Sequence, residues 1–415
     1  RTPRGIGKVG KGALAHLHPS YLGSTVLAAM AKRNNLNTAE VDDIIWGTSS
    51  QTGKQGGDLG RMAALNAGYD VRSSGVTLDR FCGSGITTVN LAAAQIMSGM
   101  EDLVIAGGTE MMSYHGQIAD PSQPPMIDSG NLELRATHPQ SQQGVCADAI
   151  ATLEGIDRDA VDDLALVSQA RAAQAIAEGR FDKSLITVKN PDGTVALDHE
   201  EFPRPETTKE GLSELKTVFS VVRDVPVDEA GTTYGALIQQ KYPEITEFNH
   251  IHHAGNSSGV VDGAAALLLA SEAYMEKSGM TPRARIVATA NMGDCPTLML
   301  NAPVPAAEKV LLKAGFTKDD IDVWEINEAF SVVAERFIRK LDLDREKVNI
   351  NGGAMALGHP IGATGSILVG TALDELERQG GRYALITMCA AGGMAPAIII
   401  ELSLIHISEP TRRYE

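Results

Sequence analysis

Apolar residues in the first part of the chain fall into short β-like runs that alternate with longer stretches of helical spacing. Residues 41–47 and 102–108 have the pattern of strands, whereas 61–67 and 86–97 carry apolar residues on a helical period. Strands that alternate with helices in this way predict an α/β unit.

The pattern changes from residue 113 to about residue 253. Three prolines break the chain near residue 120, residues 157–178 have helical spacing, and residues 182–219 are irregular and polar. We interpret 113–249 as a lid or loop domain inserted after the first unit and covering one of its faces. Within it, we expect 221–248 to form an additional surface segment.

The first pattern then returns about 280 residues later. Three landmarks recur at this offset: Trp46 with Trp324, residues 82–86 with 362–367, and the strand at 103 with the strand at 382–387. One shared offset predicts a duplicated α/β unit, with a period far longer than that of solenoid repeats. The first half would be 1–112, completed by about 250–272, and the second half would be 273–401.

Both ends of the chain look irregular. It opens on Arg1-Thr2-Pro3-Arg4 without an initiator Met, as if an earlier segment were missing. At the other end, residues 397–401 have the pattern of a last strand. Residues 402–415 have neither a clear period nor turn logic, so we expect them to be a non-native tail.

Charge and cysteine usage exclude several classes of protein. A formal net charge of −16 argues against a general binder of nucleic acid or of anionic membranes, and no apolar run approaches the roughly 20 residues of a membrane span. The four cysteines are far apart, without a C-x-x-C pair. We therefore expect a cytoplasmic protein with neither a metal site nor a disulfide framework.

Cys82 lies where a short β-like segment meets an Ala-rich helix. We expect Gly83 and Gly85 to let the backbone bend sharply there. A thiol at a helix N-terminus meets the positive end of the helix dipole and free N–H groups, which favour a thiolate and any oxyanion beside it. The alternative is a buried structural cysteine.

The second half supplies further candidates on Gly-rich turns. His359 stands between Gly358 and Pro360, and Cys389 comes shortly before paired glycines. Taken alone, His359 fits a turn histidine, and Asn327 and Glu328 fit helix-capping residues. Taken together, Cys82, His359 and Cys389 form a nucleophile, a base and a second acid or base.

At these residues the chain closely resembles the thiolase family. The motifs that carry the resemblance span roughly residues 1–401: Cys82-Gly83-Ser84-Gly85, Gly255-Asn256-Ser257-Ser258-Gly259, Asn327-Glu328-Ala329-Phe330, Gly352-Gly353-Ala354 through Gly358-His359-Pro360-Ile361-Gly362, and Cys389 with Gly392-Gly393. The resemblance implies an α/β, thiolase-like fold of two duplicated halves in α/β/α/β/α layers with a lid insertion. The family's first strand would be absent before Arg1.

The resemblance also implies a reaction and catalytic roles. The reaction is reversible acyl transfer between thioesters of coenzyme A, by Claisen condensation of acetyl-CoA or by thiolytic cleavage of a 3-ketoacyl-CoA. Cys82 would take the acyl group, His359 would activate Cys82, Cys389 would move the α-proton, and Asn327 would order a water in an oxyanion hole. Coenzyme A would be substrate and product, with no further cofactor.

Four further residues are implied to bind substrate. Ser258 and Arg204 would line the coenzyme A channel, and Ala391 and Gly392 would offer backbone N–H groups to an oxyanion. Ala391 departs from the family, which usually has Gly at that place, and it serves only if its φ is negative. Gln143 stands where the family often has Met. The family also implies a homodimer or homotetramer with acyl-CoA and CoA as its partners.

Two other interpretations stay open. One is a thiolase-like protein that binds acyl-CoA with weak or no catalysis. The other is a decarboxylating condensing enzyme, against which Cys389 argues because that class uses His or Asn in place of a second Cys. The sequence does not distinguish synthesis from degradation, and it does not fix the length of the acyl chain.

Overall fold

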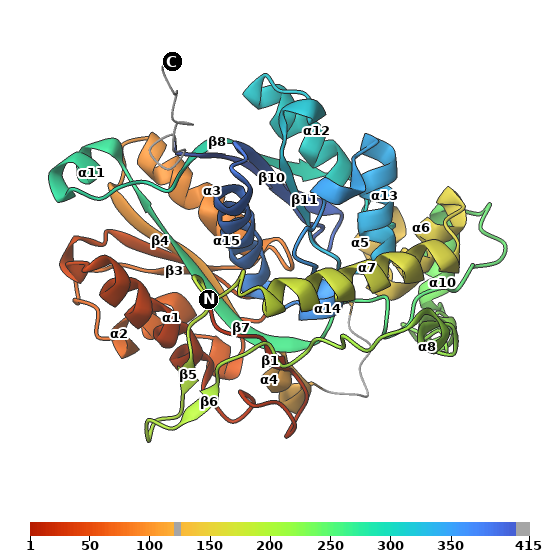
Figure 1. Cartoon of the computed structure of the whole chain (residues 1–415). Helices are drawn as coiled ribbons and strands as arrows, with labels where there is room; N and C mark the ends of the chain where they lie inside the picture. The colour runs from red at the N-terminus through yellow and green to blue at the C-terminus, as the bar shows by residue number, and fades with distance from the viewer. Residues whose placement is uncertain (120–125, 404–415) are drawn as a thin grey trace, which may run out of the picture.

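Two β-sheets form the centre of the molecule (Figure 1). The computed structural model describes residues 1–119 and 126–403, so the expected chain break at the three prolines lies outside the described residues. The strand order is β1-β7-β4-β2-β3 in the first sheet and β8-β11-β10-β9 in the second. Their strands are β1 (Gly5–Ile6), β2 (Asp43–Gly47), β3 (Val76–Leu78), β4 (Leu103–Met111), β7 (Val261–Ala270), β8 (Ala284–Gly293), β9 (Val323–Ile326), β10 (Tyr383–Thr387) and β11 (Met394–Leu402).

The helices complete five layers. Helices α3 and α15 pack against each other and contact both sheets, α1 and α2 cover the outer face of the first sheet, and α12 covers the outer face of the second. This is the predicted α/β/α/β/α arrangement. These helices and their neighbours are α1 (Pro19–Asn34), α2 (Leu59–Asn66), α3 (Ser84–Met97), α11 (Glu272–Ser278), α12 (Pro303–Ala314), α13 (Ser331–Leu341), α14 (Ala354–Leu357) and α15 (Ile361–Gln379).

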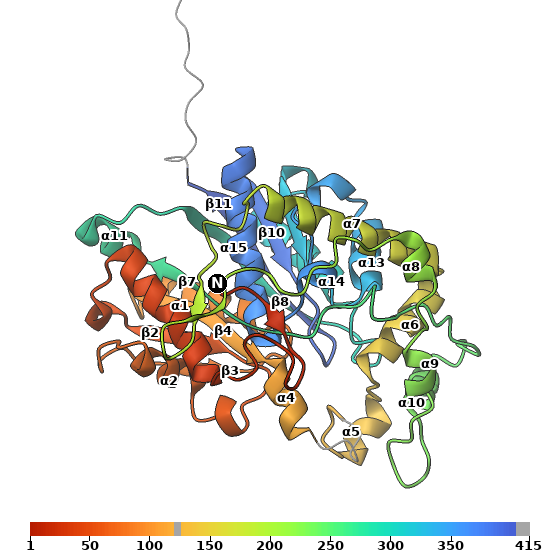
Figure 2. The ribbon, with the colours of Figure 1, turned by 60° about the horizontal axis from the view of Figure 1, so that its bottom comes forward.

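The remaining elements lie between β4 and β7 in the chain. Helices α5 to α10 gather on one side of the molecule (Figure 2), where α7 packs on α13 and α14. The elements are α4 (Met112–Ile118), α5 (Leu132–Thr137), α6 (Gln143–Glu154), α7 (Arg158–Ala177), β5 (Val188–Lys189), β6 (Val195–Leu197), α8 (Lys209–Ser213), α9 (Phe219–Val222) and α10 (Tyr234–Lys241). The domain boundaries given above stay predictions.

The segment 221–248 is more than the expected surface segment. Val221 is 72% exposed, but Leu237, Ile238 and Phe248 are buried in the same hydrophobic cluster as Trp324. Helix α10 therefore contributes to the core. The prediction failed because the apolar face of α10 is only two turns long, which is a weak periodic signal.

The duplication is visible in both sheets. β2 runs parallel to β4 with Trp46 opposite Gly107, and β9 runs parallel to β10 with Trp324 opposite Leu385. Both tryptophans are fully buried. In each half the next strand, β7 or β11, is antiparallel. The turns that follow β2, β4, β9 and β10 therefore meet near the shared centre.

The turn at Cys82 bends differently from our expectation. The residue with positive φ is Phe81 (φ 49°), whereas Gly83 has φ −75° and Gly85 lies inside α3. A Cβ on Gly85 would lie 2.7 Å from the backbone nitrogen of Gly365 in α15. Gly85 therefore serves the close approach of the two central helices, not the bend.

The edge strands β1 and β8 differ in how far they pair with their neighbours. β8 pairs with β11 along its length, whereas β1 pairs with β7 only at Gly5 and Ile6. The remaining edge of β7, up to Ala270, lines a cavity of about 1250 Å³ between the halves.

At the C-terminal end of the described chain, Leu402 pairs with Ala284 in the sheet and so does not belong to a tail. Residues 404–415 of the expected tail lie outside the described residues.

Candidate active site

The turn that carries Cys82 connects β3 to α3 and is fixed by local hydrogen bonds. The Asp79 carboxylate accepts from the Phe81 amide at 2.6 Å. The Ser84 hydroxyl accepts from the Arg80 amide at 2.8 Å and donates to the Phe81 carbonyl at 2.7 Å. These bonds hold Cys82 just before the helix, where it is 5% exposed.

The environment of Cys82 favours the thiol, contrary to the expected thiolate. Burial raises the pKa of Cys82 to about 12, and the charge of Glu110 acts in the same direction. The backbone N–H at Cys82 and a side-chain hydrogen bond from Gln143, at the start of α6, act to lower it. Desolvation thus outweighs the helix terminus, and Cys82 needs a base to become a nucleophile.

Glu110, near the end of β4, connects the two halves through hydrogen bonds from Ser49 and Gly362. Its fully buried carboxylate accepts from the amides of Ser49 and Gly362, each at 2.8 Å, and contacts His115 Nε2 at 2.9 Å. Burial acts to raise the pKa of Glu110, but the bond to His115 holds it below its ordinary value. Sequence reasoning missed this residue, although it comes two residues after the glycines that end the predicted strand 102–108.

His359 is oriented by Thr364, one turn into α15. The Thr364 hydroxyl donates its proton to the Pro360 carbonyl at 3.0 Å, so the contact of 2.6 Å to His359 Nδ1 requires Nδ1–H as the donor. His359 Nε2 then carries a free lone pair, and it has no partner among the described residues. Burial lowers the pKa of His359 to about 4. The ring is therefore a neutral base.

Cys389 follows β10 in a turn that touches the Cys82 turn. A Cβ on Gly83 would lie 3.3 Å from the Ala390 side chain. Cys389 is 1% exposed, and its pKa is raised by burial and then by the neighbouring Cys82. The structure thus brings the two predicted cysteines together from opposite halves.

The loop after Cys389 accommodates the Ala that departs from the family pattern. Positive φ angles fall on Gly392 (77°) and Gly393 (75°), and not on Ala391. Backbone bonds between Ala390 and Met394 close the loop. Ala391 is therefore unstrained, as the prediction required.

Asn327 and Glu328 do not cap a helix, contrary to the simpler interpretation. Helix α13 begins at Ser331, after Phe330, and has no side-chain cap. Glu328 accepts from Ser168 at 2.7 Å and from Asn349 at 3.0 Å, so it holds the lid against the second half. Asn327 is 1% exposed, and both polar atoms of its side chain lack a partner among the described residues. Its amide is thus available to a ligand or a water.

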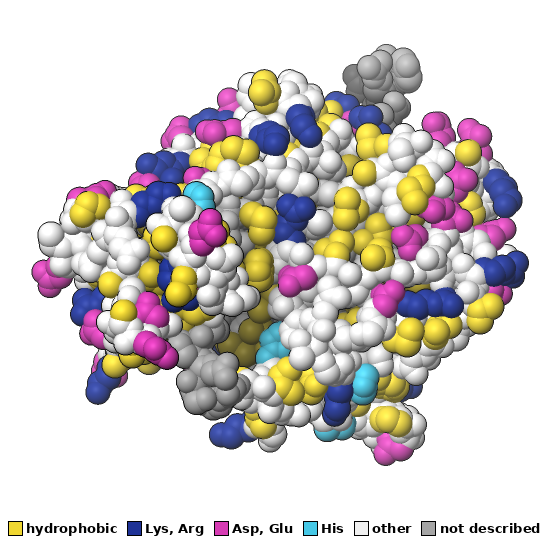
Figure 3. Space-filling model, turned by 180° about the vertical axis from the view of Figure 1, so that it is seen from behind, with side chains coloured by type: hydrophobic (Ala, Val, Ile, Leu, Met, Phe, Trp, Pro, Cys, Tyr) yellow, Lys and Arg dark blue, Asp and Glu magenta, His cyan; other side chains and the backbone are white. Residues whose placement is uncertain are grey.

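The predicted coenzyme A residues are connected through Gly259 and Phe202. The Ser258 amide donates to the Ala329 carbonyl at 3.0 Å, which ties its loop to the Asn327 turn. Arg204 is exposed, and its guanidinium lies 5.6 Å from the ring centre of Phe202. The Phe202 ring in turn packs directly over Gly259. Seen from behind, the molecule is hollowed between two lobes, with hydrophobic side chains and a histidine in the hollow (Figure 3).

Comparison with known proteins agrees with this arrangement. The sequence profile of the thiolase N-terminal domain matches residues 1–225, and that of the thiolase C-terminal domain matches residues 280–402. The chain belongs to the thiolase family. Membership makes the protein an acyltransferase with a thiolase fold, which confirms both predictions. The catalytic and binding roles of individual residues stay predictions.

Several thiolases are similar along nearly the whole chain. A β-ketoadipyl-CoA thiolase of Acinetobacter baylyi is 38% identical, over 94% of this chain and 95% of its own. A 3-oxoadipyl-CoA/3-oxo-5,6-dehydrosuberyl-CoA thiolase of Escherichia coli is 40% identical, over 97% of both chains. The crystal structure of the Bacillus anthracis acetyl-CoA acetyltransferase superposes with a TM-score of 0.79 at 32% identity, covering 97% of this chain and 96% of its own. In the part of the chain that the structure describes, no helix is long and apolar enough to cross a membrane.

Proposed function

We propose that this thiolase transfers acyl groups reversibly between thioesters of coenzyme A through an acyl-enzyme on Cys82. The observation that carries the proposal is the meeting of two buried thiols on adjoining turns of the two halves, together with a buried, neutral imidazole whose Nε2 has no partner among the described residues. A nucleophile, a base and a second proton-transfer group are the parts that this chemistry needs.

In the first step, His359 Nε2 takes the proton of Cys82 as the sulfur attacks the thioester carbonyl. The bond from carbonyl carbon to the coenzyme sulfur breaks, and the coenzyme thiolate leaves and takes up the proton from His359. A thiolate replaces a thiolate, so the step is close to balanced and reversible. The N–H groups of Ala391 and Gly392 are suited to stabilise the oxyanion that forms.

In condensation, Cys389 passes its own proton to the neutral His359 and, as a thiolate, removes the α-proton of a second acetyl thioester. The resulting carbanion forms a carbon–carbon bond with the acyl carbon, and the Cys82 sulfur leaves as a thiolate and takes back the proton from His359. The raised pKa of Cys389 makes its thiolate a stronger base. Asn327, through a water, and His359 would stabilise the enolate oxygen. Thiolytic cleavage is the same sequence in reverse.

The proposed ligands follow from the family and from the contacts that connect Ser258 with Arg204. We assign the coenzyme to the loop of Ser258 and to Arg204, as substrate and product, and expect neither a further cofactor nor a metal. The similar proteins are named for β-ketoadipyl-CoA, 3-oxo-5,6-dehydrosuberyl-CoA and acetyl-CoA, so the length of the acyl group stays open.

We also propose a cytoplasmic homodimer or homotetramer. Among the described residues, β3 pairs with β2 on one side only and forms the edge of the first sheet. Its first residue, Val76, is 44% exposed. An apolar edge strand is a surface that another chain can cover. The isolated cysteines fit a reducing compartment.

Mass spectrometry of the acyl-enzyme tests the proposal. The protein is incubated with acetyl-CoA and acetoacetyl-CoA, beside Cys82→Ala and Cys389→Ala. We expect an acetyl mass on the Cys82 peptide of the wild type, none in Cys82→Ala, and acylation without acetoacetyl-CoA synthesis in Cys389→Ala. If no donor, including longer 3-ketoacyl-CoAs, acylates Cys82, the catalytic proposal is wrong and a binding-only role replaces it.

A further inference from the structure

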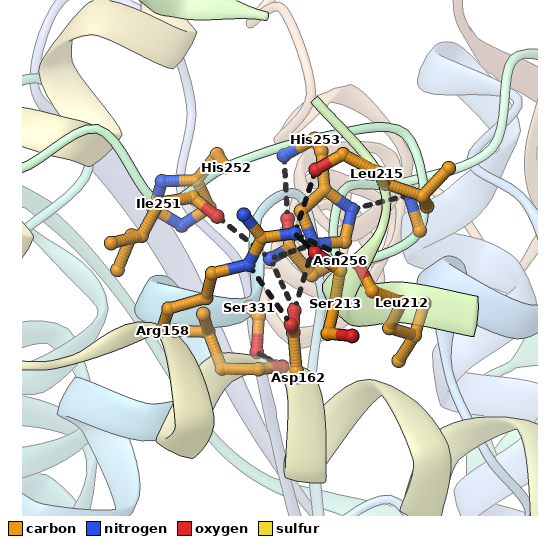
Figure 4. A network of polar contacts seen from close by, with 12 residues as sticks. Arg158, Asp162, Leu212, Ser213, Leu215, Ile251, His252, His253, Asn256 and Ser331 are labelled. Carbon is orange, nitrogen blue, oxygen red and sulfur yellow. Dashed lines mark hydrogen bonds and ion pairs between the residues drawn. The ribbon is translucent and has the colours of Figure 1, made fainter. Parts of the chain in front are cut away.

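Asp162, in the first turns of α7, is the centre of a buried polar network (Figure 4). Its carboxylate is 3% exposed. Oδ1 accepts from His253 Nε2 at 2.9 Å and from Asn256 Nδ2 at 2.8 Å, and Oδ2 accepts from Arg158 Nε at 3.3 Å. A buried carboxylate that is satisfied from three sides holds all of its partners in place.

The ring of His253 is bonded at both nitrogens. The Gly255 amide donates to Nδ1 at 3.1 Å, so Nδ1 carries no proton. The ring proton therefore lies on Nε2, which donates it to Asp162. The His253 amide donates to Asn256 Oδ1 at 2.9 Å. Together these bonds close the tight turn that leads into residues 257–259.

The turn is also clamped from the lid. Arg158, which pairs with Asp162, donates through Nη2 to the carbonyls of Leu212 and Leu215 at 2.8 and 2.7 Å. A Cβ on Gly255 would collide with Leu212, so the turn lies directly against α8. The loop is therefore held between α7 and the end of α8.

The bonds continue from this turn to the active site. The Asn256 carbonyl accepts from the Ser331 amide at 2.9 Å at the start of α13. Two residues further, the Ser258 amide is bonded to the backbone before α13, and the Gly259 carbonyl accepts from the His359 amide at 2.9 Å. A continuous chain of contacts thus connects Asp162 with the backbone of the catalytic histidine.

The loop itself has an unfilled polar group. The Ser257 hydroxyl is buried but has no partner among the described residues. Ser258 beside it is half-buried. A buried hydroxyl without a partner costs free energy unless a ligand or a water satisfies it, so Ser257 can bond to either at this loop.

We propose that Asp162 and His253 are positioning residues that hold the loop 257–259 in the shape that binds coenzyme A. The inference rests on the proposed function, because it takes the coenzyme as the ligand of this loop. Both residues act through Asn256 and do not contact the reacting atoms. Their loss therefore weakens coenzyme binding and leaves the chemical step nearly unchanged.

Two substitutions test separately the bond between His253 and Asp162 and the ion pair between Asp162 and Arg158. In His253→Asn, the shorter side chain keeps an oxygen that can accept from the Gly255 amide but does not reach Asp162. In Asp162→Asn, the charge facing Arg158 is lost. Asp163→Asn is the matched control, since that neighbouring carboxylate is 58% exposed and pairs with Lys209 at 2.8 Å.

Thiolysis kinetics and hydrogen exchange of the peptide 253–259 are measured on the full chain. We expect KM for coenzyme A to rise about tenfold in both test variants, as for the loss of one buried hydrogen bond to a charged group. We expect kcat to stay within about twofold, because the His359 ring is oriented separately by its bond to Thr364 in α15. Exchange of 253–259 should accelerate in both variants, and Asp163→Asn should match the wild type throughout.

The inference is overturned if KM for coenzyme A is unchanged, or if kcat falls as much as KM rises. It is also overturned if exchange of 253–259 stays at the wild-type rate. Failure of the proposed function is a separate result, since the wild type would then form no acyl-enzyme at Cys82. In that case, exchange of the loop with and without coenzyme A still tests whether the pair positions it.

Discussion

The turn before α3 carries Cys82, whereas the matching position about 280 residues later is Gly362, the second residue of α15. At the position that matches Cys389, which follows β10, the first half has Thr109, which lies inside β4. Thr109 accepts a hydrogen bond from the Trp46 indole at 3.0 Å, and so it serves the core. The halves share a frame, but each supplies a different part of the candidate site.

Packing explains why the halves differ. A Cβ on Gly362 would lie 2.5 Å from the Gly47 carbonyl oxygen, so no cysteine can occupy the second helix start. The Gly362 amide instead donates to Glu110 of the first half. The start of α15 has a glycine because the backbone of the first half lies in contact with it, whereas the turn before α3 carries the proposed nucleophile.

The largest effect on the reaction rate should come from removing the side-chain amide of Asn327, in the second half. We expect Asn327→Ala to lower kcat about 100- to 1000-fold, as for the loss of one oxyanion-hole donor, because the water that Asn327 orders would lose its position. KM should change little, because the amide acts on charge that develops during the reaction. Steady-state kinetics measure both constants, and a melting temperature near that of the wild type serves as the control. A change in KM alone would contradict this role.

The next effect concerns the pH dependence of stability. Burial lowers the pKa of His359 to about 4, below the 6.5 of an exposed histidine. As pH falls from 6.5 towards 4, His359 becomes protonated in the unfolded chain but not in the folded chain. The folded state therefore loses stability. His359→Asn should remove about 1.4 kcal/mol of that loss for each pH unit.

Urea unfolding between pH 7 and pH 5 measures this difference. His199→Gln is the control, because that side chain is 72% exposed. Above pH 6.5, His359 is unprotonated in both the folded and the unfolded chain, so it adds no pH dependence to the stability of the wild type. The two stability curves should then run in parallel. Parallel stability curves for the wild type and His359→Asn below pH 6.5 would mean that His359 titrates normally.

The shared frame can be broken separately from the chemistry. Gly85→Ala places a methyl group 2.7 Å from the Gly365 nitrogen, so we expect a loss of about 1–3 kcal/mol of folding free energy, as in overpacked cores. Gly370→Ala in α15 is the matched control, since a Cβ there meets only one atom, at 3.9 Å. Thermal unfolding compares the two. Equal melting temperatures would show that α3 and α15 can move apart without cost.

Much of this arrangement could be predicted from local patterns. Alternating strands and helices with paired landmarks such as Trp46 and Trp324 predict two halves. Cys82, His359 and Cys389 each stand on a Gly-rich turn, where open α/β sheets bind their ligands. Such signals lie within a few residues of the site residues, so a single sequence contains them.

The rest depends on contacts between distant segments. Glu110 reaches Gly362 across 252 positions, and no local pattern marks that pair. The sequence likewise does not reveal that Gly85 is needed for helix contact while Phe81 carries the positive φ. The pKa of Cys82 depends on how completely other segments bury it, and for that reason the helix terminus alone predicted the wrong direction.

The smallest effect sharpens the contrast between the two cysteines. Burial raises the pKa of both, but only Cys82 has a side-chain hydrogen bond, from Gln143 of the lid, that opposes the rise among the described residues. Gln143→Met should therefore raise the pKa of Cys82 by about 0.5–1 unit, since one hydrogen bond contributes about 1 kcal/mol. The pH dependence of alkylation by iodoacetamide, followed on the Cys82 and Cys389 peptides, measures it. Cys389 should keep its profile, and Gln174→Met, on an exposed face of α7, should alter neither. If both profiles shift together, the lid acts through general burial of the site and not through this amide.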